Sequence, residues 1–261
     1  MDTQPLNAAL NTTVSAAPPS AEQETINSLV ARLSFDTFDS VTDNLLALME
    51  SHQDTAGAPV VYDVVHALTK AAVEGDEKQA DGCARTCRKF TERLASTVHD
   101  PEIKSASGEL VTGGALFRKV LLNHLQVLYD EGPISLGYSR FCAHLFVLGL
   151  LVERIMHELV KKHLVATENV SDETVLALCA LLHVAGKKMD TAKAHQHMKV
   201  YLSRMGSIVK RPETSKRARF EILTLIDRRT SRWLPLSTSH PLAAVYNPVE
   251  SSSRSKGSAK C

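Results

Sequence analysis

The sequence predicts an all-α fold in which antiparallel helix pairs stack into an α-solenoid. Aromatic residues make up only 5% of the 261 residues, while Leu, Ala, Val and Lys are abundant, a balance that favours helices over sheets. Apolar residues recur at helical spacing in about ten segments, which short turns connect. The segments repeat at about 40 residues per pair, the period of HEAT-type repeats, so we expect about five antiparallel pairs forming a crescent.

Each expected helix has a local reason in the sequence. Pro59 suits a first helical position, and Gly75 suits a helix end. Ser171 suits an N-cap because two acidic residues follow it in the first turn, and Gly186 is expected to end the same helix. The segments expected on this basis are 41–49, 60–74, 76–98, 116–129, 138–151, 153–164, 172–186, 191–210 and 212–229.

The remaining segments are expected to lack regular structure. Residues 100–108 read as an irregular connector, no segment reads as a strand, and Gly113-Gly114 is expected to weaken the start of the helix that follows. Residues 1–24 and 236–261 are poor in periodic apolar residues, which predicts a disordered lead-in and tail around a scaffold domain at 25–235. On periodicity alone, an ordinary globular helix bundle is the alternative to the solenoid.

Composition argues against several classes of protein. The longest apolar run, 141–152, is interrupted by His144 and is shorter than the roughly 18–20 residues that cross a bilayer, so no membrane partner is expected. The N-terminus lacks the pattern of a secretory signal. Five scattered cysteines favour a reducing compartment, and we therefore expect a cytoplasmic protein.

The candidate catalytic motifs fail on spacing. His157 and His163 lie six residues apart on one helix, so their side chains point in different directions and cannot share a zinc ion. Cys83 and Cys87 lack a second ligand pair, and Gly186-Lys187 lacks the upstream glycine of a phosphate-binding loop. The sequence therefore predicts a protein that is not an enzyme, with no catalytic residues, no cofactor and no metal site.

Charge is segregated along the chain. Residues 187–232 contain 13 Lys and Arg but only 4 Asp and Glu, which predicts an acidic partner such as nucleic acid or an acidic protein surface. Phe220 lies among these cations, an arrangement that suits base stacking or docking to a protein pocket, although a buried Phe220 with solvated cations is the simpler alternative. The candidate RNA-binding residues are Lys187, Lys188, Lys210, Arg211, Lys216, Arg228 and Arg229.

Four stretches, in the right order, resemble the middle domain of translation initiation factor 4 gamma. They are Phe117–Asn123, Glu153–His157, Glu173–Asp190 and Lys210–Arg229, the last of which is followed by Trp233. The resemblance extends from about residue 29 to residue 235.

The resemblance implies a translation-initiation scaffold that binds and stimulates the DEAD-box RNA helicase of the initiation factor 4 complex and that contacts RNA. In that family, the scaffold contacts both RecA-like domains of the helicase. Carried over by motif, the helicase-binding residues are Val30, Leu33, Phe38, Arg217, Arg219 and Phe220. For the first three, packing within the first helix pair is an equal alternative.

The sequence also departs from the family. None of the five tyrosines begins the cap-binding-protein motif of the family, which is Tyr, four residues, Leu and an apolar residue, so that partner is expected only through regions not recognisable in this sequence. Relatives with the same fold act in splicing, poly(A)-binding-protein partnership and nonsense-mediated decay. An adaptor in RNA processing or mRNA decay is therefore the alternative function.

Overall fold

The computed structural model describes residues 20–53, 55, 57–132, 134–164 and 170–234. These residues form ten helices and one two-stranded sheet. The helices are α1 (Ala21–Ala31), α2 (Phe38–Ser51), α3 (Pro59–Glu74), α4 (Glu77–Arg93), α5 (Gly113–Asp130), α6 (Leu136–Val147), α7 (Glu153–Leu164), α8 (Asp172–Met189), α9 (His195–Val209) and α10 (Lys216–Thr230), and the strands are β1 (His99–Lys104) and β2 (Leu110–Thr112). None of these helices combines the length and the apolar character that crossing a bilayer requires.

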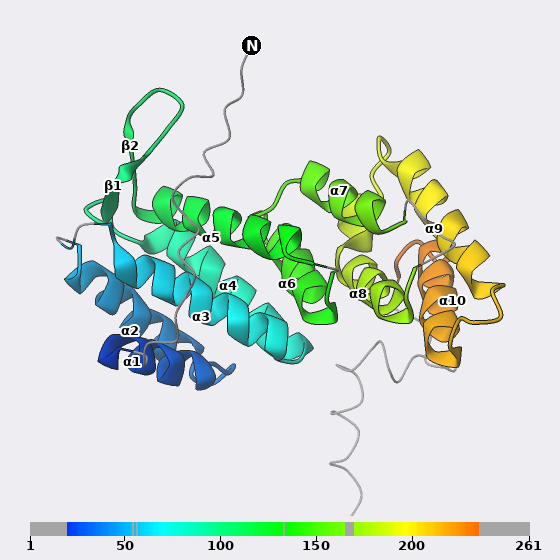
Figure 1. Cartoon of the computed structure of the whole chain (residues 1–261), viewed down its shortest axis with the longest axis horizontal. Helices are drawn as coiled ribbons and strands as arrows, with labels where there is room; N and C mark the ends of the chain where they lie inside the picture. The colour runs from blue at the N-terminus through cyan, green and yellow to red at the C-terminus, as the bar shows by residue number, and fades with distance from the viewer. Residues whose placement is uncertain (1–19, 54, 56, 133, 165–169, 235–261) are drawn as a thin grey trace, which may run out of the picture.

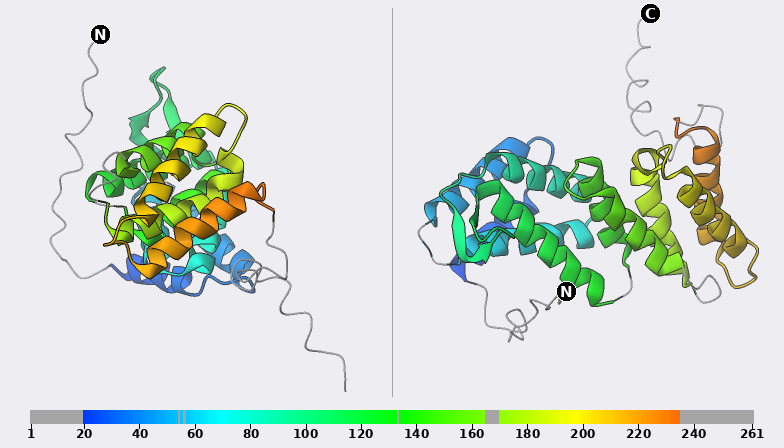
Figure 2. Two further views of the ribbon diagram at one scale, coloured as in Figure 1. Left: turned by 90° about the vertical axis from the view of Figure 1, so that its right-hand side faces the viewer. Right: turned by 90° about the horizontal axis from the view of Figure 1, so that it is seen from above.

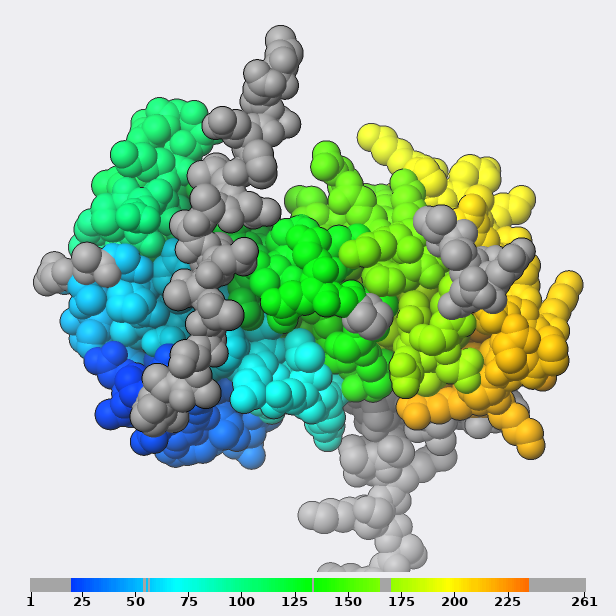
Figure 3. Space-filling model, viewed as in Figure 1, coloured from blue at the N-terminus to red at the C-terminus, as the bar shows by residue number. Residues whose placement is uncertain are grey.

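The helices stack as five pairs, from α1 and α2 at one end of an elongated molecule to α9 and α10 at the other (Figure 1). The even-numbered helices pack in series, each against the next, and form a continuous layer. The odd-numbered helices form a second layer, in which α5 and α7 barely touch. The prediction of an α-solenoid of helix pairs is confirmed, and the space-filling view shows the same progression along the chain (Figure 3).

One continuous apolar core runs through the stack. Its largest fully buried side chains include Phe90, Phe117 and Phe141. The rings of Phe90 on α4 and Phe117 on α5 meet edge to face, with centroids 5.3 Å apart, a favoured geometry for aromatic pairs. This ring pair thus joins the second helix pair to the third.

Polar caps fix several helix starts. The side chain of Ser171 accepts a hydrogen bond from the Thr174 backbone, which confirms the predicted N-cap of α8. Pro59 occupies the first turn of α3, also as predicted. A side-chain N-cap such as that of Ser171 stabilises a helix by about 1 kcal/mol. In four further helices, the N-cap side chain likewise accepts a hydrogen bond from a backbone N–H three residues on; these caps are Ser20, Asp76, Ser135 and Ser215.

The prediction that residues 100–108 form an irregular connector, in a chain without strands, is wrong. Strands β1 and β2 form an antiparallel hairpin that projects from the first half of the stack (Figure 1). Gly108, with φ +84°, adopts the left-handed conformation that the turn requires. The buried carboxylate of Asp100 accepts a hydrogen bond from the Tyr62 hydroxyl at 2.9 Å, which ties the hairpin to α3. Short strands that contain a proline give little pattern in the sequence, so the sequence alone does not predict this hairpin.

Several expected boundaries also differ. Helix α4 ends at Arg93 instead of residue 98, and α1 begins at Ala21, inside the expected disordered lead-in. Helix α5 starts at Gly113 instead of residue 116. Glycine is needed at position 114, because α4 lies so close that a Cβ there would overlap the Thr91 backbone. Residues 1–19 and 235–261, and with them most of the expected lead-in and tail, lie outside the described residues.

Candidate partner-binding surfaces

The outer face of α10 exposes two apolar side chains with a charged residue on either side of them. Lys216, Phe220, Leu223 and Asp227 fall on one face of the helix, and all four are exposed, with Phe220 at 43% and Leu223 at 50%. Helix α10 belongs to the pair that closes the stack, so in the described chain no further helix covers this face (Figure 2). We call these four residues the α10 stripe. A buried Phe220, the simpler alternative, does not agree with this exposure.

The two arginines beside Phe220 have different environments. Arg217 is exposed and lines a groove of about 370 Å³ between α6, α8 and α10. Arg219 is half-buried and donates hydrogen bonds from Nη2 to the backbone oxygens of Arg211 at 2.6 Å and Pro212 at 3.2 Å. Arg219 therefore fixes the turn that leads into α10, and Arg217 is the more accessible of the two.

The candidate RNA-binding cations divide in the same way. Lys187, Lys210 and Lys216 are exposed. The other four make contacts within the protein. Lys188 donates to the Phe146 and Val147 backbone oxygens, Arg211 pairs with Glu213, Arg228 contacts His183, and Arg229 pairs with Asp190. Lys187, Lys210 and Lys216 are therefore the cations most available to contact a phosphate.

Asp190 joins α8 to the end of α10. Its carboxylate accepts two hydrogen bonds from Arg229, at 2.9 and 3.1 Å, and one from the Trp233 indole at 3.1 Å. Burial alone would raise the pKa of Asp190, but these hydrogen bonds and the positive charge of Arg229 lower it below its ordinary value. Arg232 and Trp233 adopt left-handed conformations, with φ of 55° and 59°, which turn the chain back toward α8. Asp190, Arg229 and Trp233, which belong to the resembling stretches or follow them, therefore stabilise the contact between α8 and the end of α10.

Helix α8 continues past Gly186 to Met189, so the prediction that Gly186 ends the helix is wrong. The glycine is needed for packing, because a Cβ at this position would overlap the Trp233 ring. Glycine at a helix end and glycine under a neighbouring aromatic ring look alike in a sequence.

At the other end of the stack, the expected N-terminal contact residues lie mostly in the core. Val30 is 2% exposed and Leu33 is 7% exposed. Phe38 is half-buried, with the Lys89 ammonium 5.5 Å from its ring centroid. The burial of Val30 and Leu33 agrees with the alternative that these side chains pack within the first helix pair. Phe35, which the sequence reading did not single out, is 98% exposed between them. Its only signal in the sequence is an aromatic residue within a polar turn.

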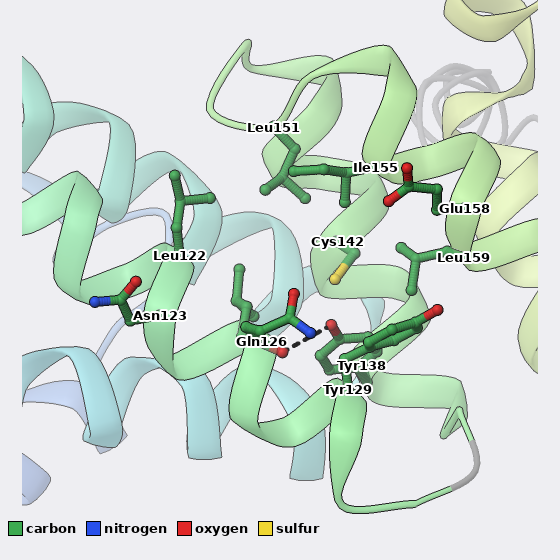
Figure 4. A pocket seen from close by; sticks show the side chains of 11 residues that line it. Leu122, Asn123, Gln126, Tyr129, Tyr138, Cys142, Leu151, Ile155, Glu158 and Leu159 are labelled. Carbon is green, nitrogen blue, oxygen red and sulfur yellow. Dashed lines mark hydrogen bonds between the residues drawn. The ribbon is translucent and has the colours of Figure 1, made fainter. Parts of the chain in front are cut away.

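A third feature is an apolar groove of about 280 Å³ where α5 and α7 separate (Figure 4). Its floor includes Tyr138, whose hydroxyl donates to the Leu125 backbone oxygen at 3.0 Å, and Cys142. Burial raises the pKa of the Cys142 thiol to about 12, so the thiol stays protonated and unreactive. Among the described residues, no group of three or more His, Cys, Asp or Glu side chains is placed to hold a metal ion.

Comparison with known proteins gives a consistent result. Residues 134–232 match the MIF4G domain. The chain is 28% identical over 262 residues to eukaryotic translation initiation factor 4 gamma of Schizosaccharomyces pombe, a match covering 89% of this chain and 18% of that protein. It is 42% identical over 101 residues to eukaryotic translation initiation factor 4 gamma 1 of Mus musculus, covering 39% of this chain and 6% of that protein.

A plant relative matches a region of similar length. Eukaryotic translation initiation factor 4G of Triticum aestivum is 38% identical over 98 residues, covering 38% of this chain and 7% of that protein. The chain thus spans less than a fifth of the length of these three relatives. The matches confirm the family resemblance that the four sequence stretches predict.

Proposed function

We infer the function of this chain from the premise that it carries a MIF4G domain, matched over residues 134–232, and resembles the middle domain of initiation factor 4 gamma. We propose that it is a cytoplasmic translation-initiation scaffold that binds and stimulates the DEAD-box RNA helicase of the initiation factor 4 complex. The observation that carries the proposal is the α10 stripe, whose exposed aromatic Phe220 lies one turn from the accessible Arg217, inside the matched region. Aromatic residues, phenylalanine included, and arginine are enriched in the cores of protein interfaces.

The solenoid suits a scaffold because its two ends are far apart and differ in charge. Residues 20–53, which form the first helix pair, contain six carboxylates and one arginine, whereas residues 187–232 are strongly basic. A rigid stack that contacts both RecA-like domains would favour the domain arrangement it fits best. Such a scaffold raises the population of one arrangement by its differential affinity, while the chemistry of ATP hydrolysis stays with the helicase.

RNA contact is the second part of the proposal. Lys187, Lys210 and Lys216 supply accessible cations, and Arg217 lies beside Phe220 on α10. Phosphate contacts of this kind give affinity that falls steeply with salt and depends little on base sequence. The RNA would then lie along the basic end of the stack, next to the helicase contact.

A pull-down tests the proposal against the alternative adaptor role. The full chain, immobilised, is expected to retain the purified helicase of the initiation factor 4 complex, and to retain it less well after Phe220→Ala. Val127→Ala serves as the matched control, because Val127 is another exposed hydrophobic residue, placed on α5. Failure of the wild-type chain to retain the helicase would contradict the proposal and favour an adaptor for other partners.

A further inference from the structure

The groove of about 370 Å³ between α6, α8 and α10 combines an apolar wall with charged side chains. Leu176, Ala180 and Val184 lie at four-residue spacing on one face of α8, and all three are half-buried. Arg217 of α10 lines the same groove and is exposed. A ligand that complements this groove therefore carries apolar side chains together with a negative charge.

The charges that line the groove do not balance. They comprise three arginines and two glutamates, a net positive charge. The Glu77 carboxylate lies 3.1 Å from Nε of Arg140, and the Glu221 carboxylate lies 3.4 Å from Nε2 of His183. Arg217, by contrast, makes no hydrogen bond or ion pair with any residue in the described part of the chain. Because a guanidinium binds a carboxylate through charge-assisted hydrogen bonds, Arg217 favours a ligand that brings one.

The chain leaves the described part of the structure beside this groove. The Trp233 backbone donates to the Arg228 backbone oxygen at 2.7 Å, and Nη1 of Arg228 donates to the His183 backbone oxygen at 3.3 Å. Arg228 and His183 both line the groove. Leu234, the next residue along the chain, is 59% exposed. Residues 235–261 therefore begin next to one end of the groove.

Part of the sequence that follows has the composition that the groove requires. Residues 241–249 are mostly apolar, whereas Ser, Thr, Lys and Arg make up most of the rest of 235–261. Glu250 directly follows the apolar run and is the single acidic residue of 235–261. The 16 residues from Leu234 to Glu250 can extend to about 50 Å, whereas Arg217 and Arg228 lie roughly 16 Å apart along α10. Glu250 can therefore reach Arg217.

We propose that residues 241–250 dock in the groove of the same chain, with their apolar side chains against α8 and the Glu250 carboxylate paired with Arg217. Because the segment is tethered, its effective concentration at the groove is in the mM range, so weak contacts suffice to hold it. A partner that uses Arg217 must then displace the segment. This regulatory consequence rests on the proposed function, whereas the docking itself does not.

Hydrogen exchange of the full chain, read by mass spectrometry, tests the docking. After correction for intrinsic rates, the amides of 242–250 are expected to exchange at least about tenfold more slowly than those of 251–260. Glu250→Arg and Arg217→Glu should each remove this protection, and the double variant, which exchanges the two charges, should restore it. Val245→Asn should also remove it. Leu236→Asn is the matched control, because it makes a similar change outside the docking segment and should leave the protection intact.

Each other outcome contradicts the inference. Equal corrected rates in 242–250 and 251–260 of the wild-type chain would mean that the segment does not dock. Protection that survives Glu250→Arg or Val245→Asn, or that the double variant fails to restore, would overturn the proposed contacts. Protection that rises with protein concentration would place the segment on a second copy instead. Helicase binding plays no part in this measurement, so a failure of the proposed function would leave the docking standing.

Discussion

The indole ring of Trp233 lies directly against the backbone of Gly186. A Cβ atom at position 186 would overlap the six-membered part of the ring, so glycine is the residue that lets the ring close over α8. The indole nitrogen meanwhile donates to Asp190, the residue that directly follows α8. This contact joins the end of α10 to α8 and holds the helix that carries the α10 stripe.

We expect Gly186→Ala to destabilise the protein by about 1–3 kcal/mol, the usual cost of overpacking a filled core. Urea unfolding followed by circular dichroism measures the change. Gly206→Ala is the control, because a Cβ on Gly206 in α9 would meet only Ile226 at 3.9 Å, an ordinary contact distance. There, alanine is expected to be neutral or slightly stabilising. Equal effects at the two glycines would contradict the packing role of Gly186.

A second prediction concerns His144, which links α6 to α4. Its ring lies 2.8 Å from Glu77 and 3.3 Å from Asp81. Burial alone would lower the pKa of His144, but the hydrogen bonds to these carboxylates and their charge raise it to about 9. Because the folded pKa lies above the ordinary value of 6.5, the charged ring stabilises the fold fully below about pH 6.5, and this stabilisation is lost as pH rises through about 9.

We therefore expect the unfolding free energy of the wild type to fall by about 2 kcal/mol between these pH values through this one group. His144→Gln should remove most of that fall, since glutamine does not titrate. Urea titrations across the range give the comparison. A variant that retains the full pH dependence would show that His144 is not the responsible group.

The third prediction concerns RNA. Replacing Lys187, Lys210 and Lys216 together by alanine should weaken RNA binding and lower the slope of log affinity against log salt by about one for each lysine that contacts phosphate. Replacing Lys70, Lys78 and Lys161, which are exposed lysines on α3, α4 and α7, changes the net charge equally and serves as the control. Equal slopes in the two triple variants would argue against a localised RNA surface.

The sequence predicts the helices well because each buries one apolar face, and that requirement repeats every three to four residues. It predicts the candidate site less well. Arg219 donates to the backbone oxygen of Arg211, and Arg229 donates to the Asp190 carboxylate. Both contacts depend on the turns of the chain around α8 and α10, which the local sequence pattern does not record. The hairpin at 99–112 also leaves no local pattern, because the residue that anchors it to α3, Tyr62, lies far away in the sequence.

The N-terminal site illustrates the same limit. Val30 and Leu33 match the motif of the resembling family, yet both side chains are needed by the core of the first helix pair. The apolar residue left outside is Phe35, which is held in water by the turn hydrogen bonds of Ser34 and Thr37. A motif in the sequence identifies the region, and only packing tells which side chain of that region is free to bind.

The most direct measurement is the rate of ATP turnover by the helicase of the initiation factor 4 complex, with RNA present, as the full chain is added. We expect the wild-type chain to raise the rate and Phe220→Ala to require at least about tenfold more protein for the same effect. Val127→Ala should behave as the wild type. A wild-type chain that leaves turnover unchanged, or a Phe220→Ala variant that stimulates at wild-type concentrations, would contradict the claim that α10 of this scaffold drives the helicase.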